Sequence, residues 1–393
     1  MKLKSIKKLN VKNKRVLVRV DFNVPIENGV IQDTTRIEAS LKTINYLIDN
    51  DAKVILMSHL GRPKGKTPEL SLKPVAKKLS EFLKKEVKFV EDCIGNEVKK
   101  VVDSLKPGDV LLLENLRFYK EEEKNDEGFS KKLAELGDVY VNDAFATAHR
   151  AHSSTYGVGV LLKEKAAGFL MEEEIDSLSR LLEDIKRPYT VILGGAKVST
   201  KLPLIKNLIG RADRILLGGG MIFTFYKSQG MKIGDSIVED DMIDEAKEIL
   251  KEAANSNVEF LLPVDVLVVD EIKEGGNKKV VQRDEIPDGF KGVDIGENSI
   301  RIFHKAMEDS KTIFWNGPMG IFEMDDFAEG SKRIGEKITE LTDKGVFTVA
   351  GGGDTISCIN KFNVKLKHIS TGGGASLEFL SGEKLLPIEL LKE

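Results

Sequence analysis

The chain is organised around short apolar runs that stop abruptly at clusters of glycine. Residues 189–195 read YTVILGG, 214–220 read RILLGGG, 346–353 read VFTVAGGG and 368–374 read HISTGGG. Apolar, β-branched runs suit buried strands, and glycine lets the backbone turn sharply where each strand ends. Longer amphipathic segments such as 240–256, DDMIDEAKEILKEAANS, separate the runs. This alternation predicts parallel sheets covered by helices on both faces.

The same rhythm fills the first half of the chain. Strands are predicted in RVLVRVDFN (15–23), KVILMSHLGRP (53–63), DVLLLENLRF (109–118) and DVYVNDAFATAH (138–149), with helices between them. Later strands are expected in EFLLPVDVLVV (259–269) and KTIFWNGPMG (311–320). Because 393 residues are enough for two domains, we predict two doubly wound, Rossmann-like α/β domains, 1–170 and 171–370. An amphipathic hinge helix over 168–188, closed by Pro188, is expected to join them.

Composition excludes several classes of protein. The net charge is −3, so no excess of positive charge indicates a nucleic-acid partner. The two cysteines form no CxxC pair, which favours a reducing compartment over a disulfide or zinc scaffold. No apolar stretch is long enough to span a membrane, and the basic N-terminus is not followed by the apolar core of a signal peptide. A cytoplasmic location is expected.

Polar residues gather where the predicted strands of the first half end. Only 13 of the 60 basic residues are arginine, yet four arginines follow these strands or the loops beside them. The full set is Asp21, Asn23, Arg36, Ser58, His59, Arg62, Glu114, Asn115, Arg117, Asn142, Asp143, His149, Arg150 and His152. Ligands of open parallel sheets bind at this edge, and guanidinium groups match phosphate and carboxylate oxygens. The pattern indicates a pocket for a small anionic metabolite. The alternative is that each arginine makes only a local salt bridge or helix cap.

The second half combines glycines with a few lysines and acids. Lys197 and Lys201 in GGAKVSTK are four residues apart, which on a helix would place both on one face, where they could hold a polyphosphate. The glycine turns would let backbone N–H groups approach phosphate. Asp354 follows Gly351, Gly352 and Gly353 directly, and its carboxylate could hold Mg²⁺. The alternative for any one glycine pair is an ordinary tight turn.

Three familiar fingerprints are absent. GRPKGKT (61–67) has three residues between its glycines, where a Walker A motif has four. No GxGxxG opens a first βαβ unit, so a dinucleotide dehydrogenase loses support, and no GxSxG elbow is present. Nor does the sequence present an obvious general base.

Nine ordered motifs resemble the phosphoglycerate kinase family and span nearly the whole chain. They are RVDFNVP (19–25), SHLGRP (58–63), ENLRF (114–118), NDAFATAHRAHSS (142–154), GFLMEEE (168–174), GGAKVSTK (194–201), WNGPMGIFE (315–323), AGGGDT (350–355) and STGGGAS (370–376). The resemblance implies phosphoryl transfer between ATP and the carboxylate of 3-phosphoglycerate, giving 1,3-bisphosphoglycerate. That acceptor is already deprotonated near pH 7, so no general base is needed.

The resemblance also implies roles for single residues. Substrate-binding positions are Asp21, Asn23, Arg36, His59, Leu60, Gly61, Arg62, Arg117 and Arg150. Nucleotide-binding positions are Lys197, Lys201, Gly292, Asn316, Glu323, Gly351, Gly352, Gly353, Asp354 and Thr355, with Asp354 as the Mg²⁺ ligand. Groups implied to stabilise the transferring phosphoryl are Arg36, Lys197, Lys201, Gly353 and Gly374.

Further implications concern the whole chain. The two substrates are expected in different domains, brought together by hinge closure that also excludes water. The tail, about 371–393, is implied to return to the N-terminal domain, and a monomer is expected. Thr200 departs from the family pattern, where an acid is common, without consequence for catalysis.

Rival hypotheses make different demands on the sequence. Another acyl-phosphate or small-metabolite kinase would need the glycine loops but not the full arginine and histidine set. A non-enzymatic nucleotide sensor would be expected to lack Arg36, Lys201 or Asp354, and all three are present.

Overall fold

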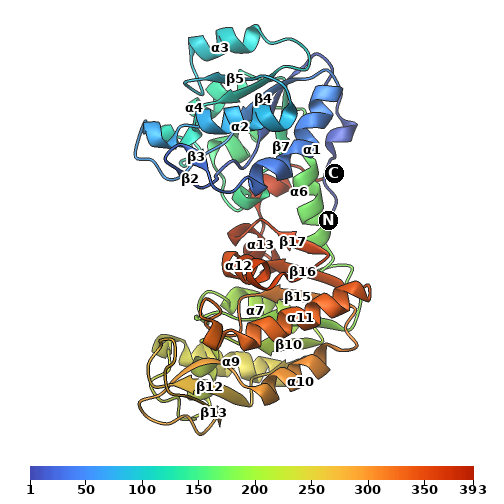
Figure 1. Ribbon diagram of the computed structural model, residues 1–393. Coiled ribbons are helices and arrows are strands. Elements are labelled where there is room, and N and C mark those ends of the chain that lie inside the picture. The colour runs from blue at the N-terminus through green and yellow to red at the C-terminus, as the bar shows by residue number, and fades with distance from the viewer. The chain divides into compact units, whose positions relative to one another are not determined.

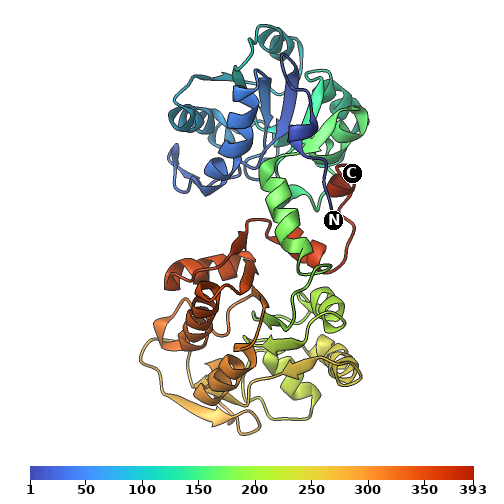
Figure 2. The same cartoon turned by 90° about the vertical axis from the view of Figure 1, so that its right-hand side faces the viewer.

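The computed structural model describes residues 1–393, which divide into two compact units. The first unit comprises Met1–Asp176 together with Lys384–Glu393, and the second comprises Ser177–Glu383. Each unit contains its own six-stranded sheet (Figures 1 and 2), as the alternating pattern predicted. The segment that returns to the first unit begins at Lys384, later than the 371 expected from the sequence.

All strands of the first sheet run parallel, in the order β5-β6-β4-β1-β7-β8. Their bounds are β1 Arg15–Arg19, β4 Lys53–Met57, β5 Val87–Val90, β6 Val110–Leu113, β7 Val139–Asn142 and β8 Lys165–Ala167. The two edge strands, β5 and β8, were not predicted from the sequence. A short hairpin of β2 (Ile26–Glu27) and β3 (Val30–Ile31) lies outside this sheet.

Helices cover both faces of the first sheet because successive strand residues point to opposite sides. Val16 and Val18 belong to one apolar core, while Leu17 between them belongs to another. Residues of α1 (Thr35–Asp49) and α2 (Lys73–Leu83) complete the first core. Those of α3 (Asn96–Asp103), α4 (Glu127–Ala134) and α5 (Val158–Leu161) complete the second. Buried strands with two apolar faces are what continuous runs such as VLLL require.

The two ends of the chain lie side by side on the first unit. Leu3 and Lys392 form an antiparallel bridge, and the Lys4 amide donates to the Leu391 carbonyl at 2.7 Å. Helix α14 (Leu386–Glu389) precedes this contact, and the Lys2 ammonium lies 3.1 Å from the Glu393 carboxylate.

The second sheet is also parallel throughout, in the order β11-β10-β9-β15-β16-β17. Its strands are β9 Tyr189–Leu193, β10 Arg214–Leu217, β11 Glu259–Leu261, β15 Thr312–Asn316, β16 Phe347–Gly351 and β17 His368–Ser370. Its helices are α7 Leu202–Ile209, α8 Ile222–Ser228, α9 Ile243–Ala254, α10 Glu297–Met307, α11 Glu329–Asp343, α12 Gly353–Phe362 and α13 Gly374–Leu380. The fold class predicted from the sequence is confirmed for both units.

A three-stranded antiparallel sheet in the second unit was not predicted. It has the order β13-β12-β14, with β12 Asp265–Val269, β13 Lys278–Gln282 and β14 Lys291–Ile295. The segment 259–269 was expected to be one strand, but it contributes β11 to the main sheet and β12 to this one. Pro263 lies between them and cannot donate a ladder hydrogen bond, so the run is interrupted there.

The expected helix over 168–188 is shorter than predicted. Helix α6 covers Phe169–Ser179, and irregular turns follow to Asp184 before β9 begins at Tyr189. The boundary between the units, at Asp176 and Ser177, falls within this helix.

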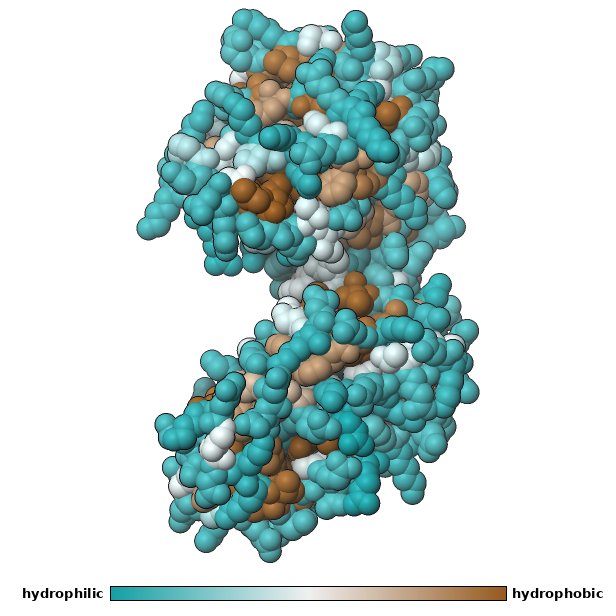
Figure 3. Space-filling view, viewed as in Figure 1, coloured by the Kyte–Doolittle hydropathy of each residue, from teal (hydrophilic) through white to brown (hydrophobic).

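Hydrophilic side chains dominate the face drawn in Figure 3, where separate hydrophobic patches interrupt them. None of the helices combines the length and apolar character needed to cross a bilayer.

Candidate active site

Four loops at the carboxyl edge of the first sheet carry most of the basic residues predicted there. The loop after β1 holds Asp21 and Asn23, and the loop after β4 holds His59 to Arg62. Arg117 lies in the short helix η3 (Leu116–Phe118) after β6, and Arg150 follows β7. Because these strands are parallel neighbours, their ends meet at one edge. We call Arg36, His59, Arg62, Arg117 and Arg150 the arginine patch.

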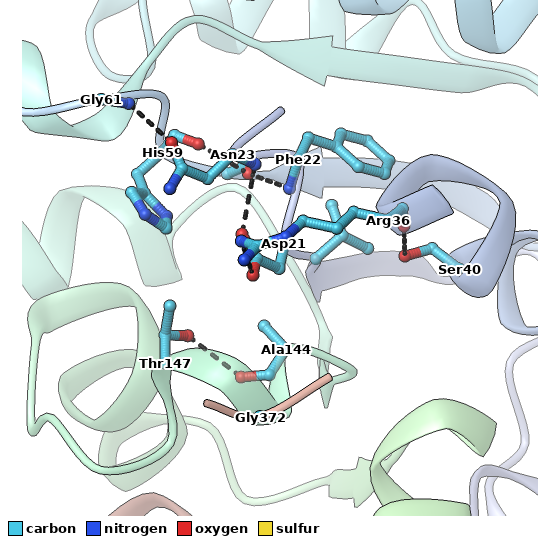
Figure 4. A network of polar contacts seen from close by, with 12 residues as sticks. Asp21, Phe22, Asn23, Arg36, Ser40, His59, Gly61, Ala144, Thr147 and Gly372 are labelled. Carbon is cyan, nitrogen blue, oxygen red and sulfur yellow. Dashed lines mark hydrogen bonds and ion pairs between the residues drawn. The ribbon is translucent and has the colours of Figure 1, made fainter. Parts of the chain in front are cut away.

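Hydrogen bonds tie this patch together (Figure 4). Arg36, from the first turn of α1, donates through Nη1 to Asp21 Oδ2 at 2.6 Å. The Gly61 amide donates to Asn23 Oδ1 at 2.8 Å, and the Gly61 carbonyl accepts from Arg117 Nη1 at 2.8 Å. The side chains of Asp21 and Asn23 therefore hold neighbouring groups in place as well as lining the patch.

Asn115 fixes the same loop from beneath. Its Nδ2 donates to the carbonyls of Leu60 and Leu70 at 2.7 and 2.9 Å, and its Oδ1 accepts from the amides of Leu60 and Arg117 at 3.2 and 3.1 Å. Leu60 is buried with both backbone groups engaged, so it offers no free polar group to a ligand. It positions the residues beside it.

The remaining members of the patch differ in exposure. Arg62 is exposed, whereas Arg150 is half-buried and its Nε donates to His149 Nε2 at 3.0 Å. Burial lowers the pKa of the Arg117 guanidinium from its usual value. Burial, and then the charge of Arg117, lowers the pKa of His152 to about 4. Positive charge held in partly desolvated surroundings favours the binding of an anion.

Arg19 was missed as a functional candidate. It lies at the end of β1, is 1% exposed, and its Nη2 is 3.2 Å from His59 Nδ1. The sequence signal that could have identified Arg19 is its place in the apolar run RVLVR, because a buried charge needs polar partners.

Asp143 contacts the start of α6 and stabilises the fold there. The Met171 amide at the start of α6 donates to its Oδ1 at 3.2 Å, and burial raises its pKa to about 6.

A pocket of about 450 Å³ opens in the second unit, which we call the glycine pocket. Glycine-rich turns after β9, β10 and β15 form part of its wall, and β14 and the exposed Ile237 and Ile272 form another part. Of the predicted residues, Gly292, Glu323 and Asp354 line it. Gly195, Gly219, Gly220 and Phe223 also line it and were not assigned, although RILLGGG marked two of them.

Two of these glycines lie where a neighbouring group leaves no room for a side chain. A Cβ on Gly219, where φ is +69°, would lie 2.4 Å from the Gly195 amide nitrogen. A Cβ on Gly292 would lie 2.0 Å from Phe223 Cζ, because the ring packs directly against the backbone there. Side chains at these positions would displace the wall of the pocket.

Lys197 and Lys201 do not share a helical face, so that expectation is wrong. Both lie in the loop before α7, which begins at Leu202 with Pro203 in its first turn. Lys197 is exposed, whereas the ammonium of Lys201 contacts Asn316 Oδ1. Burial lowers the pKa of Lys201 to about 8, and the Asp354 carboxylate opposes that shift.

Asn316, at the end of β15, links Lys201 to the turn after β16. Its Nδ2 donates to the Gly351 carbonyl, and a Cβ on Gly352, where φ is +100°, would meet that nitrogen at 2.6 Å. Gly353 and Asp354 follow, both exposed, and begin α12. The Thr355 hydroxyl is buried, accepting from the Gly317 amide and donating to the Gly351 carbonyl, each at 2.8 Å. It is therefore already occupied within the protein.

Gly374 begins α13 and is exposed, but it does not line the glycine pocket.

Three exposed carboxylates line the glycine pocket, Asp235, Glu323 and Asp354, and Asp354 at the start of α12 is the one predicted to hold a hard cation. No cluster of three or more His, Cys, Asp or Glu side chains arranged to bind a metal occurs in the chain. Mg²⁺ commonly takes one or two carboxylates and completes its shell with water and phosphate oxygens. The residues present therefore fit a magnesium ion that arrives with a nucleotide.

Comparison with known proteins gives one consistent result. The family model for phosphoglycerate kinase matches residues 6–383. The cytosolic phosphoglycerate kinase 3 of Arabidopsis thaliana is 52% identical over 392 residues, covering 99% of this chain and 98% of that protein. The chloroplastic phosphoglycerate kinase 1 of the same plant is 54% identical, covering 96% and 79%. Among solved structures, phosphoglycerate kinase from Coxiella burnetii matches with a TM-score of 0.93 at 40% identity, covering 99% of both chains.

Proposed function

Because the chain belongs to the phosphoglycerate kinase family, enzymes that transfer a phosphoryl group reversibly between 1,3-bisphosphoglycerate and ADP in glycolysis, we propose that it binds its two substrates at two separate sites. The arginine patch of the first unit is the site for 3-phosphoglycerate or 1,3-bisphosphoglycerate. The glycine pocket of the second unit is the site for ADP or ATP. The observation that carries this proposal is the division of the chemistry: guanidinium groups in one unit, and a pocket lined by glycines beside a half-buried lysine in the other.

In the first site, the arginine patch neutralises the phosphate and carboxylate of 3-phosphoglycerate. Arg62 adds charge at the exposed side, Arg150 adds charge from a half-buried position, and Arg36 is oriented by Asp21. Guanidinium groups suit this task because they present paired donors in one plane.

In the second site, the base is expected against the apolar wall formed by Phe223, Ile237 and Ile272, since all three line the pocket. The phosphates then lie toward Lys197, Lys201 and the first amides of α12, with Glu323 and Asp354 at the rim. Thr355 supports the turn through its hydroxyl, and its backbone amide faces the same helix start.

Mg²⁺ is proposed to bind Asp354 together with nucleotide phosphate oxygens. When bound, it would neutralise phosphate charge as the phosphoryl group is transferred.

Catalysis is proposed to rest on charge stabilisation and alignment. The acceptor carboxylate needs no deprotonation, so the protein's task is to hold the reactants in line and to stabilise the phosphoryl oxygens. Lys201 and Arg36 are the principal cations, with Lys197 and the amides at Gly353 and Gly374 as further donors. The lowered pKa of Lys201 is expected to rise when phosphate binds, because an anion favours the charged form.

Bringing the substrates together is proposed to require movement of one unit relative to the other. Their candidate sites belong to different units of the chain, and the boundary lies within α6. Closure would also exclude water from the phosphoryl group. Small-angle scattering with each substrate alone and with both is the test, and the hinge hypothesis fails if both together produce no compaction.

We also propose that the chain acts as a monomer in the cytoplasm. Both candidate sites are formed within one chain, which supports the first part. Relatives named cytosolic and chloroplastic both match closely, and the cytosolic one covers the chain over nearly its full length.

The experiment that tests the sites is ATP-dependent turnover of 3-phosphoglycerate with Mg²⁺, in which the acyl phosphate is consumed by a coupled reduction. Wild type is compared with Lys201→Ala and with Lys206→Ala, an exposed lysine on α7, as the matched control. Loss of turnover only in Lys201→Ala supports the assignment. Equal activity in all three would reject the role given to Lys201.

A further inference from the structure

The environment of Arg19 determines the state of the His59 ring. The Arg19 Nε donates to Ser154 Oγ at 2.7 Å, its Nη1 donates to the Val20 carbonyl, and its Nη2 lies 3.2 Å from His59 Nδ1. A guanidinium group has only donors, so the third contact is a hydrogen bond only if His59 Nδ1 is the acceptor. The ring nitrogen facing Arg19 therefore carries no hydrogen.

The far end of this network fixes its direction. The Ser154 hydroxyl accepts from Arg19 and donates to Glu122 Oε1 at 2.5 Å, while the Ser154 amide donates to Glu122 Oε2 at 3.0 Å. The Glu122 side chain is buried. Glu122 is the acceptor at one end of this network, and the Arg19 guanidinium in its middle can only donate. His59 Nδ1, at the other end, must therefore be a hydrogen-bond acceptor.

Charged groups from three elements oppose protonation of His59. The ring is 4% exposed, and burial followed by these charges holds its pKa well below the usual value. They are Arg19 at the end of β1, Arg117 in η3 and Arg36 on α1, while His152 after β7 is neutral above its own pKa of about 4. The nearby Asp21 carboxylate is paired with Arg36. A neutral ring with a bare Nδ1 carries its hydrogen on Nε2.

We propose that Arg19 is a positioning residue that holds His59 as the neutral tautomer with hydrogen on Nε2, so that the ring donates one hydrogen bond to the anionic substrate. The contact with Arg19 uses Nδ1 and leaves Nε2 on the other side of the ring, and Figure 4 shows His59 beside Asp21 and Arg36 in the arginine patch. This role rests on the proposed assignment of that patch to 3-phosphoglycerate. His59 thus contributes direction to binding, and the arginines contribute charge.

The tautomer can be measured without substrate. In protein labelled with ¹⁵N, ring-nitrogen spectra are recorded from about pH 5 to about pH 8, the range in which histidine normally titrates. The His59 signals are assigned by their loss in His59→Gln. The expected result is an unprotonated Nδ1 and a protonated Nε2 throughout the range. Hydrogen on Nδ1, a mixture of tautomers, or protonation near the usual pKa would overturn the proposal.

The functional part uses 3-phosphoglycerate and the same spectra. Addition of 3-phosphoglycerate is expected to move the Nε2 signal of His59. A locked tautomer with no such shift would overturn the substrate role while leaving the tautomer assignment intact. If the enzyme still turns over 3-phosphoglycerate although the Nε2 signal does not move, the substrate role of His59 fails while the assigned enzyme activity stands.

Arg19→Met provides the kinetic test, with Arg15→Met at the other end of β1 as the matched control. In Arg19→Met, His59 loses both its donor and a repelling charge, so it regains titration. We expect the ratio of the variant and wild-type KM values for 3-phosphoglycerate to rise at least about threefold from pH 6 to pH 8, since protonated His59 attracts the anion. Titration of the substrate phosphate cancels in this ratio. A ratio independent of pH would assign Arg19 a purely structural role, and if the variant does not fold, the wild-type spectra still decide.

Discussion

The two candidate sites are built from different parts of the polypeptide. The arginine patch depends on long side chains, and Asn115, Asp21 and Arg19 hold those side chains or their loops in place. The glycine pocket depends on the backbone, which approaches itself at Gly195 and Gly219 and packs against Phe223 at Gly292. The first site should therefore be sensitive to loss of charge, and the second to gain of volume.

The largest expected effect tests whether each unit serves one substrate. Arg36→Ala and Lys201→Ala should each lower kcat by roughly 10²-fold or more, the usual result of losing a preorganised donor. Steady-state kinetics and direct nucleotide binding measure the effects. Arg36→Ala should leave ADP affinity unchanged. A loss of kcat below about threefold in either variant would contradict the assigned role.

Adding a single methyl group should damage the glycine pocket. In Gly292→Ala the new Cβ would lie 2.0 Å from Phe223 Cζ, so the ring must move into the pocket. Overpacking of this kind costs about 1–3 kcal/mol, and ADP affinity should fall by roughly tenfold. Calorimetric titration measures it. Gly210→Ala is the control, since nothing lies within 4 Å of its Cβ, and equal losses in both variants would refute the explanation.

A buried acid should make the stability of the second unit depend on pH. Burial raises the pKa of Asp294 to about 7, although it accepts from the Gly330 amide at 2.7 Å. Since the folded protein keeps this proton between about pH 4 and pH 7 while the unfolded chain loses it, Asp294 should lower stability as the pH rises through that window. The slope is at most ~1.4 kcal/mol per pH unit.

Denaturant unfolding followed by the single tryptophan, Trp315, measures this effect in the second unit. Asp294→Asn should be less sensitive to pH across the window, although it loses one backbone acceptor. An unchanged slope would show that Asp294 is ionised in the folded protein.

A further expected effect concerns Thr355, whose hydroxyl bridges Gly317 and Gly351. Thr355→Val should lower the free energy of unfolding by ~1–3 kcal/mol, because it leaves a buried amide without its acceptor. Thr355→Ser keeps the hydroxyl and should resemble wild type. If ADP affinity falls with no loss of stability in Thr355→Val, the hydroxyl contacts nucleotide directly.

Local patterns were sufficient to predict the fold class and to place most of the candidate substrate-binding residues at the carboxyl edge of the first sheet. Apolar runs such as RILL and VLLL bury both faces of a strand only when helices cover both sides of the sheet. The parallel sheets could therefore be predicted from composition and spacing. The polar residues at strand ends followed from the geometry of parallel sheets. These inferences rest on residues adjacent along the chain and on the general topology of parallel sheets, so the sequence alone is enough to make them.

The predictions that were wrong depended on contacts between residues that are distant in the chain. Lys201 lies in the loop before α7, where its ammonium contacts Asn316, 115 residues later in the chain, and the run 259–269 divides because β12 pairs with β13 and β14. The bare Nδ1 of His59 follows from Arg19, 40 residues earlier. The sequence by itself determined which residue types stand at the ends of strands. Only the tertiary structure decided which of their donors and acceptors are already used within the protein and which remain for a ligand, because that depends on contacts between segments that no local pattern encodes.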